Sequence, residues 1–130
     1  MTQKPLKIFI AGPYGDPTTL LATQGAALCK KTIQTNITKA DEIGRQLALK
    51  GHSPLIPHKM LQGWEDDPRF KTEDFMKIDL DWLKLADALF FIGPSKGADR
   101  ELALAKKEKK LIFYKIEDVP DVRGSESRRR

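Results

Sequence analysis

An aspartate stands on the apolar face of a predicted helix, where a charged group is out of place. The helical pattern covers residues 73–86, and the neighbours of Asp79 on its own face are Phe75, Met76, Trp82, Leu83 and Ala86. A charge directed towards a core is costly unless it has a hydrogen-bonded partner or faces a cavity. We therefore expect Asp79 to be functional. Asp81 instead faces Lys77 and Lys84 and is predicted to be an ion-paired surface carboxylate.

Glu101 repeats this anomaly in a second predicted helix, residues 97–110. Its neighbours on that helix are Gly97, Ala98, Leu104 and Ala105. Glu101 lies in the opening turns, where the helix dipole favours the ionised carboxylate that a nucleophile requires. A structural alternative is that Glu101 caps the first turn of its helix, although its spacing from Ser95 is too long for a simple capping box. Asp87, just before a predicted strand, is expected to fix a loop.

Two inward-facing carboxyl groups at one edge of a sheet indicate glycosyl chemistry. An oxocarbenium-like transition state requires a carboxylate close to the anomeric carbon, and the leaving group requires a proton. We expect no metal centre, because the chain has one cysteine, Cys29, and two histidines, His52 and His58. The sequence contains neither the dinucleotide pattern GxGxxG nor the phosphate-loop pattern GxxxxGK(S/T), so we expect no cofactor.

The elements that must position these carboxyl groups alternate between strands and helices along the chain. Short apolar runs predict strands, and amphipathic stretches predict helices. The predicted strands cover residues 7–11, 52–57, 88–92 and 111–115, and the predicted helices cover residues 36–50, 73–86 and 97–110. This alternation implies parallel strands joined by right-handed crossovers. We therefore predict a doubly wound parallel sheet of four to five strands in three α/β/α layers.

Ligands of open parallel sheets bind beyond the carboxyl ends of the strands, where the winding reverses. The first and third predicted strands both end in a Gly-Pro turn. If these strands are neighbours, the two turns face each other across a crevice, and their glycines allow the close approach of a phosphate or hydroxyl-rich ligand. Ordinary turn formation is the alternative explanation. The candidate substrate-binding residues are Gly12, Pro13, Tyr14, Gly93, Ser95 and Gly97, together with Trp64 from the long connection 59–72.

Length and composition fit one domain. The chain has 130 residues, of which 40% are hydrophobic and 32% are charged, as is typical of a globular domain. We expect the domain to cover residues 1–116. Residues 16–35 are too long for a strand-to-helix loop and are predicted to form an insertion or lid with an extra short helix, before a helix capped by Thr35 or Asn36. Residues 117–130 are predicted to be a flexible polar tail.

The net charge of +5 raises the question of nucleic-acid binding. Residues 117–130 carry as many acidic as basic side chains, so the excess lies in the body, notably in Lys106, Lys107, Lys109 and Lys110. No aromatic residue alternates with these lysines, and a solvated helix end explains them more simply, so nucleic acid is not an expected partner. No apolar run is long enough for a membrane span or a signal peptide, and we expect a cytoplasmic protein.

Three segments carry a family resemblance: KIFIAGPYG (7–15), NITKADEIGRQLALKGHSPLIPH (36–58) and DLDWLKLADALFFIGPSKGADRELALA (79–105). The last is the most specific, because it has Asp79, a second aspartate opening a strand, then Ser-x-Gly and Glu101 within a helix. Together they resemble the nucleoside 2-deoxyribosyltransferase superfamily, which includes deoxynucleoside 5′-monophosphate N-glycosidases. The resemblance implies a flavodoxin-like or Rossmann-like fold, in agreement with the alternation of elements.

The resemblance also implies residue roles. Glu101 matches the family's nucleophile, which attacks C1′ of the sugar and forms a glycosyl-enzyme intermediate. Asp79 matches the aspartate that contacts the departing base and helps to protonate it. Ser95 matches a serine that binds the 5′-phosphate in the monophosphate glycosidases, and Gly12 and Tyr14 match the loop that lines the sugar pocket. The implied activity is cleavage of the N-glycosidic bond of a nucleoside or its 5′-monophosphate, by hydrolysis or by transfer of the sugar to a second base.

The chain departs from the family pattern at two places. The family commonly has a tyrosine in its first strand whose hydroxyl supports the nucleophile, and the matching residue is Phe9, with Tyr14 as a candidate substitute. The first loop lacks the arginine of the monophosphate glycosidases, so Lys96 or an adjacent subunit is the expected source of positive charge. Family members assemble as homodimers or larger homo-oligomers that complete each other's sites, and we expect the same. Phe9 leaves an alternative function open, a non-catalytic nucleotide-binding or sensing module on the same fold.

Overall fold

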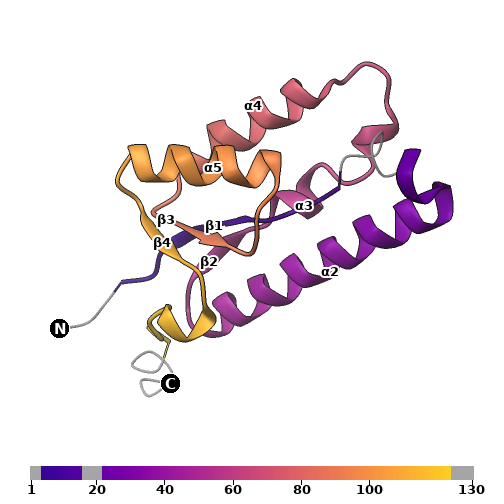
Figure 1. Cartoon of the computed structure of the whole chain (residues 1–130). Helices are drawn as coiled ribbons and strands as arrows, with labels where there is room; N and C mark the ends of the chain where they lie inside the picture. Colours follow the sequence, from indigo (N-terminus) through magenta and orange to yellow (C-terminus); the bar gives the residue numbers. More distant parts are fainter. Residues whose placement is uncertain (1–3, 16–21, 124–130) are drawn as a thin grey trace.

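A central parallel sheet organises the chain. The computed structural model describes residues 4–15 and 22–123. Its strands are β1 (Lys7–Ala11), β2 (Ser53–Leu55), β3 (Ala88–Phe91) and β4 (Leu111–Phe113). They are all parallel and lie in the order β2-β1-β3-β4 (Figure 1). The winding of the sheet therefore reverses between β1 and β3, as in flavodoxin-like folds, and the predicted doubly wound α/β sheet is confirmed.

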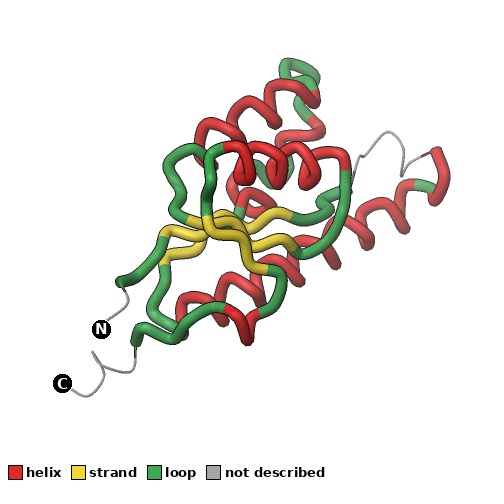
Figure 2. Tube along the Cα trace, turned by 60° about the vertical axis from the view of Figure 1, so that its left-hand side comes forward, coloured by secondary structure: helices red, strands yellow, loops and turns green. Residues whose placement is uncertain are grey.

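Helices cover both faces of this sheet. They are α2 (Ala26–Leu49), α3 (Pro57–Met60), α4 (Thr72–Leu83) and α5 (Lys96–Lys107), with short 3-10 helices at Trp64–Asp66 and Ile116–Asp118. The long helix α2 packs on one face, and α4 and α5 lie side by side on the other (Figure 2). The fold therefore has the three expected layers. Among the residues that the structure describes, no helix is both long enough and apolar enough to cross a membrane.

Alternation along β1 distributes the core between the two faces of the sheet. Ile8 and Ile10 are fully buried on the face that α2 covers, where they belong to one core cluster with Leu47 of α2. Phe9 and Ala11 are also fully buried and pack towards α4 and α5. Because successive strand residues point to opposite faces, a strand covered on both sides is apolar throughout. This is why residues 8–11 of β1 are all apolar and buried, and only Lys7 at its start is exposed.

The crossover helix α2 is one continuous helix of 24 residues. The predicted insertion or lid at 16–35 lies partly outside the described residues, since 16–21 are not described, but residues 26–35 belong to α2 itself. The predicted helix start at Thr35 or Asn36 is therefore wrong. The buried residues Cys29, Ile33 and Ile37 continue the apolar stripe of the later turns, and nothing between them interrupts the helix.

The C-terminal segment packs against the body as far as the structure describes it. The sequence predicts a flexible tail over 117–130, but Val119 is 2% exposed and Val122 is 8% exposed. The Lys50 ammonium donates hydrogen bonds to the backbone oxygens of Ile116 and Val119, each at 2.8 Å. The backbone amide of Val122 donates in turn to the Lys50 oxygen at 2.8 Å. For residues 117–123 the flexible-tail prediction is thus wrong, and residues 124–130 lie outside the described residues.

We expect the substitution Gly51→Ala to loosen this segment. Gly51 has a φ of 97°, and an added Cβ would lie 2.8 Å from Val122 Cγ2 and 3.0 Å from the backbone nitrogen of Arg123. The substitution adds backbone strain and pushes the segment away, so we expect a loss of about 2–3 kcal/mol in the free energy of unfolding, measured by urea denaturation. Gly63→Ala is the matched control, because Gly63 has a φ of 89° but nothing within 4 Å of an added Cβ. Equal losses in the two variants would contradict the packing of this segment.

Candidate active site

Asp79 and Glu101 meet between α4 and α5. Asp79 lies in the C-terminal half of α4, and Glu101 lies in the second turn of α5. A hydrogen bond joins the two carboxyl groups. Glu101 is only 5% exposed, and Oδ1 of Asp79 is buried without a hydrogen-bond partner among the described residues. The fold therefore brings together the two acidic side chains that the sequence singles out.

Local contacts at the start of each helix hold this pair in place. The Ser95 hydroxyl accepts a hydrogen bond at 3.0 Å from the backbone amide of Ala98, and this contact caps α5. The Asp74 carboxylate accepts one at 2.7 Å from the backbone amide that precedes α4. An ion pair of 2.9 Å between Arg100 and Glu73 joins the two helices at the surface. These contacts fix the residue at which each helix begins. They therefore also fix the positions of Asp79 along α4 and of Glu101 along α5.

The two carboxyl groups hold a proton at neutral pH. Burial, the negative charge of Asp79 and the shared hydrogen bond raise the pKa of Glu101 to about 9. Burial raises the pKa of Asp79 to about 6, against the opposing effect of the hydrogen bond with Glu101. The expectation that the helix dipole keeps Glu101 ionised is wrong. The helix dipole acts mainly within the first turn, and Glu101 lies beyond that turn. Glu101 is also buried beside another acid.

Two other aspartates in the same region behave as the sequence predicts. Asp81 forms ion pairs with Lys77 at 2.9 Å and with Lys84 at 4.0 Å on the exposed side of α4. The Asp87 carboxylate accepts a hydrogen bond at 2.8 Å from the backbone amide of Lys7 and so fixes the loop before β3. Helical spacing therefore separates a surface carboxylate from a buried one only two residues away.

The two Gly-Pro turns are neighbours, as expected. Ala11 pairs with Phe91 in the sheet, and the backbone amide of Ile92 donates to the oxygen of Ala11 at 2.7 Å. The Gly12 turn lies so close to the Gly93 turn that a Cβ added at Gly12 would be 2.9 Å from Ile92 Cβ. This close approach requires glycine at position 12. The turns meet where the winding of the sheet reverses, which is the usual ligand position in such folds.

Neither of two cavities on the surface is lined by Asp79 or Glu101. The larger, of about 610 Å³, is an open groove along the exposed side of α2. The smaller, of about 70 Å³, lies between the two Gly-Pro turns and α2. Glu101 is buried, whereas Asp79 is partly exposed, so Asp79 is the more accessible of the two carboxyl groups.

The hydroxyl of Tyr14 is bound to Glu65 and not to Asp79 or Glu101. It donates a hydrogen bond at 2.9 Å to Glu65, and burial together with the Glu65 charge raises the pKa of Tyr14. Phe9 is fully buried on the face of the sheet that α4 and α5 cover. Tyr14 therefore does not replace the hydroxyl that Phe9 lacks, and the candidate substitution is wrong.

The remaining candidate residues lie at the same end of the sheet. Trp64 is 40% exposed and packs on Phe70 with ring centroids 4.9 Å apart. Phe70 also contacts Phe75, which lies one turn before Asp79 on α4. Gly97, in the first turn of α5, faces Met76, whose sulfur would lie 3.9 Å from an added Cβ. A row of aromatic side chains thus leads from Trp64 towards the start of α4.

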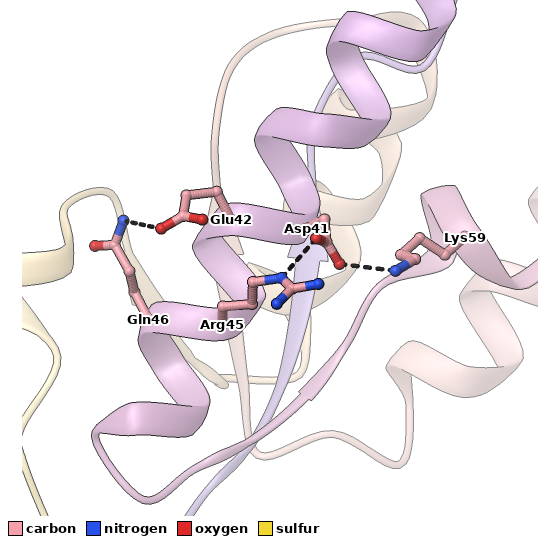
Figure 3. A network of polar contacts seen from close by, with 5 residues as sticks. All are labelled: Asp41, Glu42, Arg45, Gln46 and Lys59. Atoms are coloured by element: carbon pink, nitrogen blue, oxygen red, sulfur yellow. Dashed lines mark hydrogen bonds and ion pairs between the residues drawn. The ribbon is translucent and has the colours of Figure 1, made fainter.

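His58 lies beside the first Gly-Pro turn, and the sequence analysis does not single it out. It is 5% exposed, its Nε2 lies 3.1 Å from the oxygen of Pro13, and its Nδ1 is buried with no partner among the described residues. Burial lowers the pKa of His58, so the ring is neutral. The helical turn α3 that carries it is joined to α2 by an ion pair of 2.8 Å between Lys59 and Asp41, and Arg45 of α2 binds the same carboxylate (Figure 3). One sequence feature could have indicated this position. Pro57 starts a helical turn at the carboxyl end of β2, and His58 is the next residue.

No group of three or more histidine, cysteine, aspartate or glutamate side chains within the described part of the chain is arranged to hold a metal ion. Asp79 and Glu101 form a pair without a third such ligand. Their arrangement suits proton transfer and nucleophilic attack, the two tasks that carboxyl groups perform in glycosyl chemistry.

The family model for the Domain of unknown function (DUF7768) matches residues 7–115. The chain belongs to this family. The DUF7768 match covers all four strands, both Gly-Pro turns, Asp79 and Glu101. The family description assigns no activity.

A solved structure shares the fold of this DUF7768 chain. It is a 2-desoxiribosyltransferase from Leishmania mexicana, with a TM-score of 0.51 and 18% sequence identity. The similarity covers 83% of this chain and 62% of that enzyme, so the chain spans less than two thirds of the enzyme's length. At this identity the comparison shows a shared fold. No curated protein matches the sequence.

Proposed function

We propose that this protein cleaves the N-glycosidic bond of a nucleoside or of a nucleoside 5′-monophosphate. The observation that carries the proposal is the approach of Asp79 and Glu101 between α4 and α5, with Glu101 only 5% exposed. The raised pKa values of both groups leave one proton on the pair at neutral pH. A double displacement at a sugar needs one ionised carboxylate as nucleophile and one protonated carboxyl group as acid. With one proton shared between Asp79 and Glu101, the pair can supply one carboxylate and one carboxylic acid. The fold shared with a 2-desoxiribosyltransferase supports the same reaction class.

The proposed reaction separates the two carboxyl groups. The sugar enters between them and breaks their hydrogen bond, and the proton passes from Glu101 to Asp79. The Glu101 carboxylate attacks C1′ as the bond from C1′ to the base nitrogen breaks, and the electron pair of that bond remains on the base. Asp79 gives its proton to the base. Water or a second base then displaces Glu101 from C1′ and gives a proton to the Asp79 carboxylate, which completes hydrolysis or transfer.

The test is a product assay. The protein is incubated with a panel of nucleosides, 2′-deoxynucleosides and their 5′-monophosphates, with and without an acceptor base, and free base and new nucleoside are separated by chromatography. Release of free base without an acceptor indicates hydrolysis, and a new nucleoside with an acceptor indicates transfer. Absence of both products across the panel would refute the proposal.

We expect Asp79→Asn to slow the departure of poor leaving groups most. An amide cannot give a proton to the base, so bases that need protonation should be released about 100-fold more slowly, while sugars with an activated nitrophenyl leaving group should lose far less. The two rates are measured as kcat/KM for each substrate class. An equal loss for both classes would argue against a proton-donating role for Asp79.

A second candidate function is nucleotide binding without catalysis. Two observations favour it: Phe9 brings no hydroxyl to the buried pair, and the Tyr14 hydroxyl is bound to Glu65 instead. Such a module would show a ligand-induced rise in melting temperature but no free base under the same conditions. The product assay and a thermal shift measured on the same panel separate the two functions.

A further inference from the structure

The smaller cavity lies at the point where the winding of the sheet reverses. Pro13 and Gly93 line it from the turns after β1 and β3, Ile92 lines it from the end of β3, and Asn36 and Lys39 line it from α2. It faces α2, whereas Asp79 and Glu101 lie on the α4 and α5 side of the sheet. The cavity is therefore separate from the acidic pair, although both are next to the Gly-Pro turns.

The charges around this cavity favour an anion. Lys39 forms no ion pair with any residue that the structure describes, whereas Arg45 on the same helix is bound to Asp41 at 2.8 Å. None of the residues lining the cavity is acidic. The Asn36 amide is held by a hydrogen bond of 3.0 Å to the oxygen of Tyr14, so the wall that carries Lys39 is tied to the loop after β1.

The size of the cavity limits the ligand. A cavity needs roughly 10–15 Å³ to hold one water molecule, so about 70 Å³ accommodates a group of a few heavy atoms. A nucleobase does not fit this space. Gly93 leaves its side of the cavity open, because a Cβ added there would meet only Pro13 Cδ, at 3.9 Å. Backbone next to glycine at such a switch point is a frequent site for phosphate groups.

We propose that this cavity binds a phosphate group and that Lys39 supplies the positive charge. The proposal rests on the proposed function where the phosphate belongs to a nucleoside 5′-monophosphate, and stands without it where the ligand is free phosphate. It places the cation on α2 rather than on Lys96 or on another subunit. Ser95 is not part of this cavity, since its hydroxyl caps α5.

The test compares Lys39→Met with Lys31→Met. Both lysines are exposed on α2 and keep their aliphatic stems when replaced by methionine, but only Lys39 lines the cavity. Binding of inorganic phosphate, of four 2′-deoxynucleosides and of their 5′-monophosphates is measured by calorimetry, with Glu101→Gln present in every protein to prevent turnover. We expect Lys39→Met to weaken phosphate and monophosphate binding about tenfold, to leave nucleoside binding unchanged, and Lys31→Met to have no effect.

The possible outcomes differ in meaning. Loss of monophosphate affinity specific to Lys39→Met supports a substrate phosphate in the cavity. Loss confined to inorganic phosphate supports the anion site and overturns its link to the substrate. Equal effects of the two variants, or no effect of either, would overturn the proposal. Because binding is measured without turnover, a failure to release base in the product assay leaves this result readable on its own.

Discussion

Glu101→Gln is expected to reduce the release of free base by about 10³-fold or more, because an amide cannot form the covalent bond to C1′. Substrate binding should be retained, since glutamine has the shape of glutamate and can donate a hydrogen bond to the Asp79 carboxylate. The measurement is base release under saturating substrate, combined with a direct binding assay. The expected pattern is a large fall in kcat with a small change in affinity.

Asp81→Asn is the matched control for this variant. Asp81 carries the same kind of side chain as Asp79 on the same helix, but it is paired with Lys77 on the surface. We expect its substitution to leave base release within about twofold of the wild type, because exposed ion pairs contribute little. Unaltered turnover in Glu101→Gln would refute the assignment of Glu101 as the nucleophile. An equal loss of activity in Asp81→Asn would indicate that the lost activity reflects a folding defect.

The stability of the protein is expected to fall as the pH rises above about 5. In the unfolded chain both carboxyl groups lose their protons near pH 4, whereas in the folded chain the pKa of Asp79 is about 6 and that of Glu101 is about 9. Between these values the folded state binds more protons, so the free energy of unfolding decreases with pH. The loss is fully developed above about pH 9 and should be on the order of a few kcal/mol.

The comparison with Glu101→Gln isolates this effect. His58 acts in the opposite direction below about pH 6.5, because burial lowers its pKa and the unfolded chain then binds the extra proton. Surface carboxylates with lowered pKa values act near pH 4 and below. Both contributions are common to the wild type and the variant. Urea denaturation from pH 5 to pH 9 should therefore give a much flatter profile for Glu101→Gln, and parallel profiles would contradict the coupling of the two acids.

The sequence is informative about the fold and about which face each acidic residue occupies. Helical spacing alone puts Asp79 on the buried side of α4 and Asp81 on the exposed side, and the structure agrees. The apolar runs at β1 and β3 predict buried parallel strands. Because these strands pair, the two Gly-Pro turns that follow them lie side by side. These properties depend on residues close together in the chain, whose periodicity can be read directly.

Other features depend on contacts between distant segments, and the sequence does not reveal them. The protonation of Glu101 follows from its approach to Asp79 across two helices. Glu65 binds Tyr14 from 51 residues away, and this contact decides where the phenol points. The packing of Val122 rests on Lys50, 72 positions earlier in the chain. No local sequence pattern predicts such pairs. For residues 117–123 the polar composition predicts an unpacked segment, whereas Val119 and Val122 are buried.

The length of α2 has a consequence for how this family can diversify. At 24 residues the helix extends about 36 Å, whereas the five residues of β1 extend roughly 17 Å. Its later turns join the main core through Ala40 and Leu47, and its earlier turns hold the Tyr14 ring through Cys29, Ile33 and Ile37. Substitutions in the earlier turns should therefore move the Tyr14 loop with little effect on the main core, so that on the proposed function they would change ligand preference more than stability.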